Sequence, residues 1–135
     1  MVLLDTSAIF ALTDAKDAHH EEAVRILKRL DDRGEELLLH TYILLEAFAL
    51  IHRRHGLRTA IKVSRDLGHV ETITVDRVLH DEAASWLGSR PGRSMQGASL
   101  VDAVSFRVLR REGMEEAFAF DPDFTRAGFR LASAT

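Results

Sequence analysis

The chain has 135 residues, the usual size of one domain, and apolar residues make up 46% of it, enough for a sizeable core. The formal net charge is −3, which excludes a generally basic nucleic-acid-binding coat but not a local basic patch. Because there is no cysteine, disulfides, thiolate metal sites and a cysteine nucleophile are all excluded.

The N-terminus carries no recognisable targeting segment. It has no basic n-region, and Asp5 interrupts the first apolar run too early for a secretory signal peptide. No apolar run approaches the ~18 residues that a membrane span needs. We therefore expect a cytoplasmic protein without membrane association, and a chain without cysteine is compatible with a reducing compartment.

Short apolar strands alternate with helices along the chain. In chain order, the patterns predict a strand at Val2–Leu4, a helix at Ala18–Arg33, a strand at Leu37–Leu39, helices at Thr41–His55 and Leu57–Leu67, a strand at Val70–Val75, a helix at Asp76–Leu87, a loop at Gly88–Ala98, a helix at Leu100–Arg111, and strands at Phe118–Phe120 and Arg130–Ala132. This alternation predicts an α/β fold with a central parallel sheet flanked by helices on both faces. The piece after the loop is too short for a second domain, so we expect residues 1–135 to form a single domain.

The helix at Thr41–His55 is apolar on nearly every side, so we expect it to be buried in the core or in an oligomer interface. Its one acid, Glu46, lies within the run YILLEAFALI. A buried carboxylate is costly unless it is paired, protonated or bound to a metal, and no Lys or Arg lies within one helical turn of it. The alternative is that Glu46 reaches the edge of the helix or pairs with a distant arginine.

Further acids stand beside apolar stretches. Asp5 follows the first strand, Asp121 follows the strand FAF with Asp123 two residues on, and Asp102 lies at the start of a helix. The carboxyl ends of strands are where sites form in open α/β sheets. They are also where helices begin, so capping is the alternative: Asp5 could cap the next helix, and the run SLVD fits a capping box.

If the strand order brings these elements together, the acids that share one cleft are Asp5, Glu46, Asp102 and Asp121. Two such charges ~5 Å apart repel by roughly 3 kcal/mol at an effective dielectric of about 20, so several of them call for a cation. Oxygen ligands without cysteine or an obligatory histidine suit Mg²⁺ or Mn²⁺ better than zinc. The sequence therefore predicts a divalent-metal site built from carboxylates.

In their order along the chain, these motifs resemble those of the PIN domain family, in particular of the VapC-type toxin ribonucleases. VLLDTSAIFAL resembles the opening motif, TYILLEAFAL the segment that carries the glutamate, SLVDAVSF the third motif and FAFDPDF the closing motif. The resemblance covers essentially the whole chain and implies a PIN-like fold. It implies catalytic metal ligands at Asp5, Glu46, Asp102 and Asp121, a further acid at Asp123, and auxiliary hydroxyls at Thr6, Ser7, Ser99 and Ser105.

The same resemblance implies a Mg²⁺- or Mn²⁺-dependent endoribonuclease, the toxin of a toxin–antitoxin pair, that hydrolyses RNA phosphodiester bonds. A divalent ion lowers the pKa of a bound water, and Thr6 or Ser7 would orient that water or a phosphate. VapC toxins usually form homodimers and are held inactive by a cognate antitoxin, so we expect both partners besides RNA. The number of ions, one or two, stays open, because Val101 stands where the family often has threonine.

Phosphate contacts need basic side chains, which the acidic motifs do not supply. One candidate cluster comprises Arg53, Arg54, Arg58, Lys62 and Arg65. A second comprises Arg90 and Arg93 in the flexible loop at Gly88–Ala98. We expect one of the two clusters to guide RNA to the acids, and the alternative for the first is the solvated face of an amphipathic helix.

Two rival functions are compatible with parts of the sequence. FDPDFT matches the Asp-x-Asp-x-Thr signature of haloacid-dehalogenase-type phosphatases, but that signature opens its fold, whereas only ten residues follow Thr125 here. A degenerate PIN domain that binds RNA or a partner without catalysis would not need all the expected acids, nor Glu46 in an apolar helix. The sequence therefore favours the nuclease over both rivals.

Overall fold

The computed structural model describes residues 1–135 as a five-stranded parallel sheet with helices around it. The strands are β1 (Val2–Leu4), β2 (Leu37–His40), β3 (Glu71–Ile73), β4 (Glu116–Phe118) and β5 (Arg130–Leu131), in the spatial order β3-β2-β1-β4-β5. The helices are α1 (Thr6–Thr13), α2 (His20–Asp32), α3 (Thr41–His55), α4 (Leu57–Leu67), α5 (Arg77–Gly88), α6 (Arg90–Ser94), α7 (Leu100–Arg111) and α8 (Asp123–Arg126). All neighbouring strands are parallel, so the predicted α/β class is confirmed.

β1 lies at the centre of the sheet because it is apolar on both faces. Its residues Val2, Leu3 and Leu4 are at most 3% exposed. Leu3 is in register with Leu38 of β2 and with Ala117 of β4, so three apolar strands form the buried middle of the sheet. A continuous apolar run of this kind is typical of a parallel strand that is covered on both faces.

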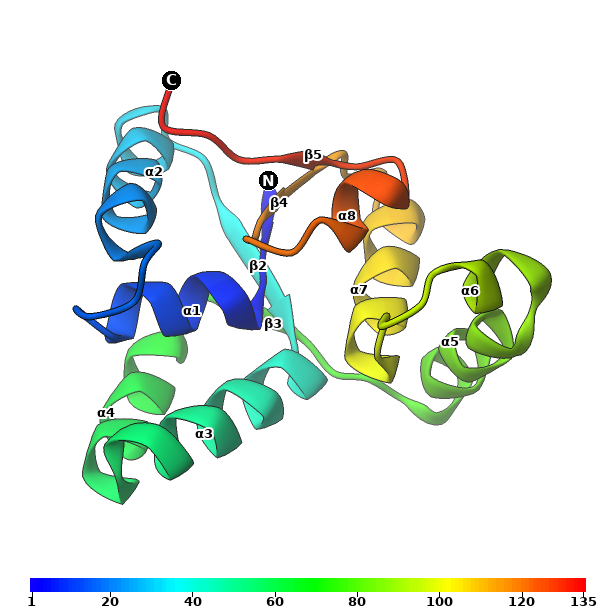
Figure 1. Cartoon of the computed structure of the whole chain (residues 1–135), viewed down its shortest axis with the longest axis horizontal. Coiled ribbons are helices and arrows are strands. Elements are labelled where there is room, and N and C mark those ends of the chain that lie inside the picture. The colour runs from blue at the N-terminus through cyan, green and yellow to red at the C-terminus, as the bar shows by residue number, and fades with distance from the viewer.

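Helices cover the sheet on both sides. Figure 1 shows α1, α2 and α4 on one side of it and α5, α6 and α7 on the other. In the same view α3 crosses the lower end of the sheet, where β1 and β2 end and where α1 and α3 begin. The carboxyl ends of the central strands therefore meet the starts of these helices at one edge, which is where sites form in open α/β folds.

α3 has one buried stripe rather than burial on nearly every side. The stripe consists of Ile43, Ala47 and Ile51, each at most 1% exposed, at the i, i+4, i+8 spacing of a helix face. Leu45, outside that stripe, is 68% exposed. The core therefore covers one face of this helix. Burial of the other face in an oligomer interface, the alternative that the sequence suggests, stays a prediction.

The segment Gly88–Ala98, predicted as a loop, contains the short helix α6. Ser89 caps this helix through its Oγ, which lies 3.4 Å from the Gly92 N–H, and Pro91 stands in its first turn. These are ordinary helix-start residues, but a helix of five residues is too short to show an apolar period. The expected flexible loop is therefore wrong for this part of the segment.

The strands are shifted or shorter than the apolar runs suggest. β4 covers Glu116–Phe118 rather than Phe118–Phe120, because its ladder with β1 pairs Leu4 with Phe118 and ends there. β3 covers only Glu71–Ile73 of the predicted Val70–Val75. The shift of β4 matters for the site, because Phe120 and Asp121 then lie after the strand, in the segment that leads away from the sheet.

No helix of the fold combines the length and the apolarity that crossing a membrane requires.

Candidate active site

A cleft of about 460 Å³ at the carboxyl edge of the sheet brings together four of the acids singled out in the sequence. Asp5 comes from the end of β1, Glu46 from α3, Asp102 from the first turn of α7 and Asp121 from the segment between β4 and α8. We call these four residues the cleft acids. Arg53 is the only basic residue that lines the cleft. The cleft is therefore negative, and protons or a bound cation must offset the like charges.

Asp5 is held in place by Ser7. It is the N-cap of α1, and its Oδ2 accepts hydrogen bonds from the Ser7 N–H (3.1 Å) and from Ser7 Oγ (2.6 Å). Ser7 Oγ accepts in turn from the Phe120 N–H at 3.0 Å, which ties the start of α1 to the chain just after β4. Asp5 therefore does cap a helix, as the alternative interpretation holds, and it lines the cleft as well.

Burial raises the pKa of Asp5 from 3.8 to about 6. The hydrogen bonds from Ser7 oppose this rise, and the charges of Glu46 and Asp121 add to it. A carboxyl group in this position is reluctant to ionise unless a positive charge enters the cleft.

Thr6 carries a buried hydroxyl without a partner. The residue is 6% exposed and lines the cleft, yet its Oγ1 forms no hydrogen bond. Leaving a buried hydroxyl unpaired costs about 1–3 kcal/mol, so such a group invites a ligand. Ser7 Oγ, in contrast, is already engaged with Asp5 and Phe120. Of the two hydroxyls expected to orient a water or a phosphate, only that of Thr6 is free.

Asp102 caps its own helix and lines the cleft at the same time. The Ser99 N–H donates to Asp102 Oδ2 (2.9 Å) and the Asp102 N–H donates to Ser99 Oγ (3.1 Å), which is the capping box that the sequence predicts. Burial raises the pKa of Asp102 to about 6; the Ser99 hydrogen bonds oppose the rise, and the charges of Asp5 and Asp121 add to it. Capping and a role in the cleft are therefore compatible in one residue.

Asp121 and Asp123 lie in one turn but in different surroundings. Asp102, Asp121 and Asp123 each have a carboxylate oxygen within 4.8 Å of the other two. Asp121 Oδ1 accepts from the Asp123 N–H at 2.9 Å and has no basic partner. The Asp123 side chain is only 8% exposed, and its Oδ1 accepts from Arg126 Nη1 at 2.8 Å. Asp123 therefore has a counter-ion of its own, whereas Asp121 does not.

Glu46 is partly buried and reaches the cleft from the middle of α3. No salt bridge joins it to a basic residue, so the expected alternative of a distant arginine partner is not found. Arg53 lies two turns further along the same helix and lines the same cleft. α3 thus presents one carboxylate and one guanidinium to the cleft.

Ser105 lies away from the cleft and serves the core. It is fully buried, and its Oγ lies 2.8 Å from Nε2 of His40, which is also fully buried. His40 Nδ1 accepts from the Ile43 N–H at 3.3 Å and so caps α3, which leaves Nε2 to donate to Ser105. Burial lowers the pKa of His40 to about 3, so the ring is neutral. The structure therefore does not bring Ser105 to the cleft acids. The only sign of its partner in the sequence is a single histidine after the run LLL.

The basic residues of the first predicted cluster divide into three places. Arg53 lines the acidic cleft, whereas the guanidinium of Arg54 lies 5.8 Å from the ring centre of Phe10 on α1. A separate cleft of about 490 Å³ is lined by residues of α4 that include Arg58, Lys62 and Arg65. The second predicted cluster, Arg90 and Arg93, lies on α6 rather than in a flexible loop.

The donor set of the acidic cleft fits a hard divalent cation. Apart from Arg53, every side-chain ligand atom that lines it is a carboxylate or hydroxyl oxygen. A cation there would also relieve two costs of the fold. It would offset the burial and the like charges that together raise the pKa values of Asp5 and Asp102. It would also give the Thr6 hydroxyl a partner, either the cation itself or a water bound to it.

Comparison with known proteins agrees with the geometry of the cleft. A family model described as PIN domain matches residues 2–130. The chain belongs to the PIN domain family. The resemblance expected from the sequence motifs is thereby confirmed over nearly the whole chain, and the four cleft acids all fall within the matched part of this PIN domain.

This PIN domain is 35% identical over 133 residues to the 23S rRNA-specific endonuclease VapC20 of Mycobacterium tuberculosis, in an alignment that covers 96% of this chain and 95% of the relative. The crystal structure of that VapC20, described as a sarcin–ricin loop cleaving toxin, superposes with a TM-score of 0.83 at 33% identity over 96% of both chains. This PIN domain therefore belongs to the VapC group.

Two more distant structures share the fold. They are VapBC2 from Rickettsia felis bound to promoter DNA, with a TM-score of 0.68 at 13% identity over 97% of both chains, and DNA-bound VapBC from Salmonella typhimurium, with a TM-score of 0.65 at 12% identity over the full length of both chains. At such identities the likeness shows the fold alone.

Proposed function

We propose that this PIN domain is a metal-dependent endoribonuclease, the toxin component of a toxin–antitoxin pair, that hydrolyses RNA phosphodiester bonds. The observation that carries the proposal is the convergence of the four cleft acids in a chain 35% identical to an rRNA endonuclease. A PIN domain that only binds a partner would have no need of these like charges, because their repulsion lowers its stability. The non-catalytic alternative is therefore disfavoured.

In this proposal the cleft acids hold Mg²⁺ or Mn²⁺, and Asp123 joins them through Oδ2, since only its Oδ1 accepts from Arg126. When bound, the ion supplies Lewis acidity toward the phosphate and makes a water more acidic. The protein supplies position. Ser7 fixes the Asp5 carboxylate through two hydrogen bonds to Oδ2, and the Ser99 N–H fixes that of Asp102 through one.

Arg53 is the residue we assign to the phosphate, because it is the only cation that lines the cleft and its planar guanidinium matches phosphate geometry. We expect Arg53→Ala to lower kcat/KM for RNA cleavage by about tenfold, the effect of losing one charged hydrogen bond. Arg54→Ala is the matched control, since Arg54 lies over Phe10 instead. Equal losses in both variants would contradict this assignment.

The remaining basic residues are proposed to attract RNA from further away. Arg58, Lys62 and Arg65 on α4 and the pair on α6, Arg90 and Arg93, are the two candidate surfaces. Replacing either set by glutamine should weaken RNA binding and flatten its dependence on salt concentration. Full affinity with an unchanged salt slope in both sets would exclude this role.

The partners follow from the same proposal. A VapC toxin is expected to form a homodimer and to be inhibited by a cognate antitoxin, and the exposed Leu45 of α3 is an apolar group that such a contact would cover. A cytoplasmic location fits this role, since RNA is its substrate. Both the homodimer and the location stay predictions.

The test is cleavage of total RNA and of intact ribosomes by the purified protein, with sarcin–ricin loop RNA as the first defined substrate because of the name of the relative. The reactions contain Mg²⁺, Mn²⁺ or EDTA, and a parallel set uses the double variant Asp5→Asn, Asp102→Asn. We expect cleavage that needs both the metal and the acids. No cleavage by folded protein free of antitoxin, under any of these conditions, would contradict the proposal.

A further inference from the structure

An aromatic pair that includes the residue before Asp121 has no part in the proposed chemistry. The rings of His19 and Phe120 are stacked, with centroids 4.4 Å apart and planes 13° from parallel. Phe120 is partly buried, whereas His19 is exposed in the connection between α1 and α2. The stack therefore projects from the core to the surface, and the histidine ring is its outer layer.

Both members of the pair are fixed in place. The Phe120 N–H donates to Ser7 Oγ at 3.0 Å. The His19 N–H donates to Asp17 Oδ1 at 2.8 Å, and the next residue, His20, is anchored through its Nδ1, 2.7 Å from the carbonyl oxygen of Ala11. The His19 ring itself forms no hydrogen bond or ion pair within the chain, so its polar edge is as free as its outer face.

The pair is connected to the acidic cleft through Phe120. Phe120 directly precedes Asp121, a cleft acid, and its N–H is bonded to Ser7, which also lines the cleft. A group that stacks on His19 would thus be held next to the segment that carries Asp121. It would approach from the α1–α2 side, whereas Arg53 approaches from α3.

We propose that His19, supported by Phe120, is a stacking platform for one unpaired base of the RNA next to the scissile phosphate. Single-stranded RNA is recognised by stacking its bases on aromatic rings, histidine included, and by hydrogen bonds to their edges. A preformed, exposed ring with free nitrogens offers both. This inference rests on the proposed nuclease function and adds a residue that selects where the RNA is cut.

The experiment uses short single-stranded RNAs that carry the fluorescent base 2-aminopurine at successive positions. Binding is measured in Mg²⁺ with all variants built on Asp5→Asn, so that the RNA stays intact. We expect the fluorescence at one position to be quenched by stacking. We expect His19→Ala to remove the quenching and to weaken binding by about tenfold, and His19→Phe to preserve both.

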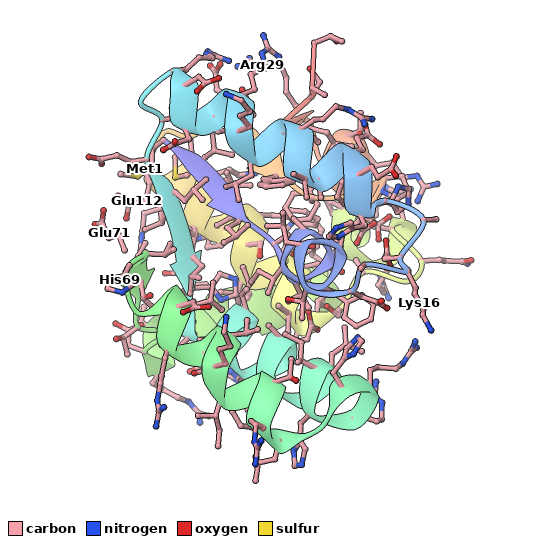
Figure 2. All side chains as sticks on the ribbon, turned by 90° about the vertical axis from the view of Figure 1, so that its left-hand side faces the viewer. Met1, Lys16, Arg29, His69, Glu71 and Glu112 are labelled. Carbon is pink, nitrogen blue, oxygen red and sulfur yellow. The ribbon has the colours of Figure 1, made fainter.

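The control is His69→Ala. His69 is also an exposed histidine, and Figure 2 shows it on the opposite side of the molecule from Lys16, which lies in the same connection as His19. We expect this variant to bind like its parent.

An RNA with an abasic residue at the quenched position should bind the parent protein more weakly than the intact RNA does. The abasic RNA should show no further loss of affinity with His19→Ala, because both changes remove the same contact.

The outcomes separate this inference from the proposed function. If the unmodified protein and the single variant His19→Ala cleave RNA alike, and His19→Ala on the Asp5→Asn background binds RNA like its parent, the platform is wrong and the nuclease stands. If His19→Ala weakens inhibition by the antitoxin without affecting RNA, the ring serves the partner and the inference is overturned. If the protein neither binds nor cleaves RNA, both proposals are contradicted.

Discussion

Two neighbouring strands of the sheet end in buried polar residues, and the fold treats the two ends in opposite ways. At the end of β2, His40 has a partner for each ring nitrogen, the Ile43 N–H and Ser105 Oγ. After β1, Asp5 has hydrogen bonds to one carboxylate oxygen only, and the hydroxyl of Thr6 beside it has none. We call the β2 end closed, because its buried polar groups all have partners. We call the β1 end open, because some of its polar groups lack partners and lie among like charges.

This difference distinguishes buried polar groups that stabilise the fold from buried polar groups that bind a ligand. A buried polar group with all its partners stabilises and specifies the fold, and it offers nothing to a ligand. A buried polar group without partners lowers stability and persists where a ligand supplies what is missing. The His40 and Asp5 ends should therefore respond in opposite ways to substitution.

The largest expected effect lies at the open end. Asp5→Asn should lower RNA cleavage more than about a hundredfold, because even residues that only support a metal ligand are worth 10–100-fold. Steady-state cleavage rates in Mg²⁺ and Mn²⁺ measure this loss. Asp81→Asn is the matched control, since Asp81 is an exposed carboxylate paired with Arg77 on α5. Comparable losses in both variants would mean that the cleft has no special role.

The next effect lies at the closed end and concerns stability rather than activity. Ser105→Ala leaves the buried Nε2–H of His40 without an acceptor, so we expect the free energy of unfolding to fall by about 2 kcal/mol. Urea denaturation measures it, with Ser85→Ala, an exposed serine of α5, as the control that should stay within about 0.5 kcal/mol. Unchanged stability of Ser105→Ala would show that the network is not closed as described.

The long helices could be predicted from the sequence because their limits are local. α3, α4 and α7 begin and end at the predicted residues, and Gly56, with φ at +91°, separates the first two. α6 and α8 have five and four residues, too few for an apolar period to show. Where β4 ends depends on its register with β1, which no local pattern contains.

The candidate site was predictable to a similar depth. Acids at strand ends, an acid at a helix start and an unpaired glutamate in an apolar helix lead to the cleft acids, because parallel strands end at one edge. Ser105 stands three residues after Asp102, so spacing alone suggests the same neighbourhood, yet its partner His40 lies 65 residues away in the chain. The pairing of Asp123 with Arg126 and the stacking of His19 on Phe120 likewise depend on contacts that appear only in the folded chain.

A smaller expected effect is the pH dependence of stability at the open end. The pKa of Asp102 is about 6 in the folded chain and near 3.8 when unfolded, so the folded state binds more protons between pH 4 and 6. Stability from this group is therefore lost as the pH rises through that window. In EDTA, Asp102→Asn should melt like wild type near pH 4 and a few degrees higher above pH 6.

The lowered pKa of His40 has the opposite effect on stability, because stability from a neutral buried ring is lost as the pH falls. This effect is the same in wild type and in Asp102→Asn, so it cancels in the difference between their melting temperatures. Mg²⁺ should stabilise wild type more than Asp102→Asn, because the variant has one ligand charge fewer. A melting difference that does not change with pH would show that neither burial nor the other acids raise the pKa of Asp102 in the folded chain.

The smallest effect tests the open end most directly. Thr6→Val keeps the shape of the side chain and removes an unpaired hydroxyl, so the metal-free protein should lose no stability and gain about 1 kcal/mol, the low end of the cost of an unpaired buried hydroxyl. The same substitution should reduce the stabilisation by Mg²⁺, whereas Thr6→Ser, which retains the hydroxyl, should not. Urea denaturation with and without Mg²⁺ measures both. A loss as large as that of Ser105→Ala would mean that Thr6 Oγ1 does have a partner, and then the two strand ends would not differ in kind.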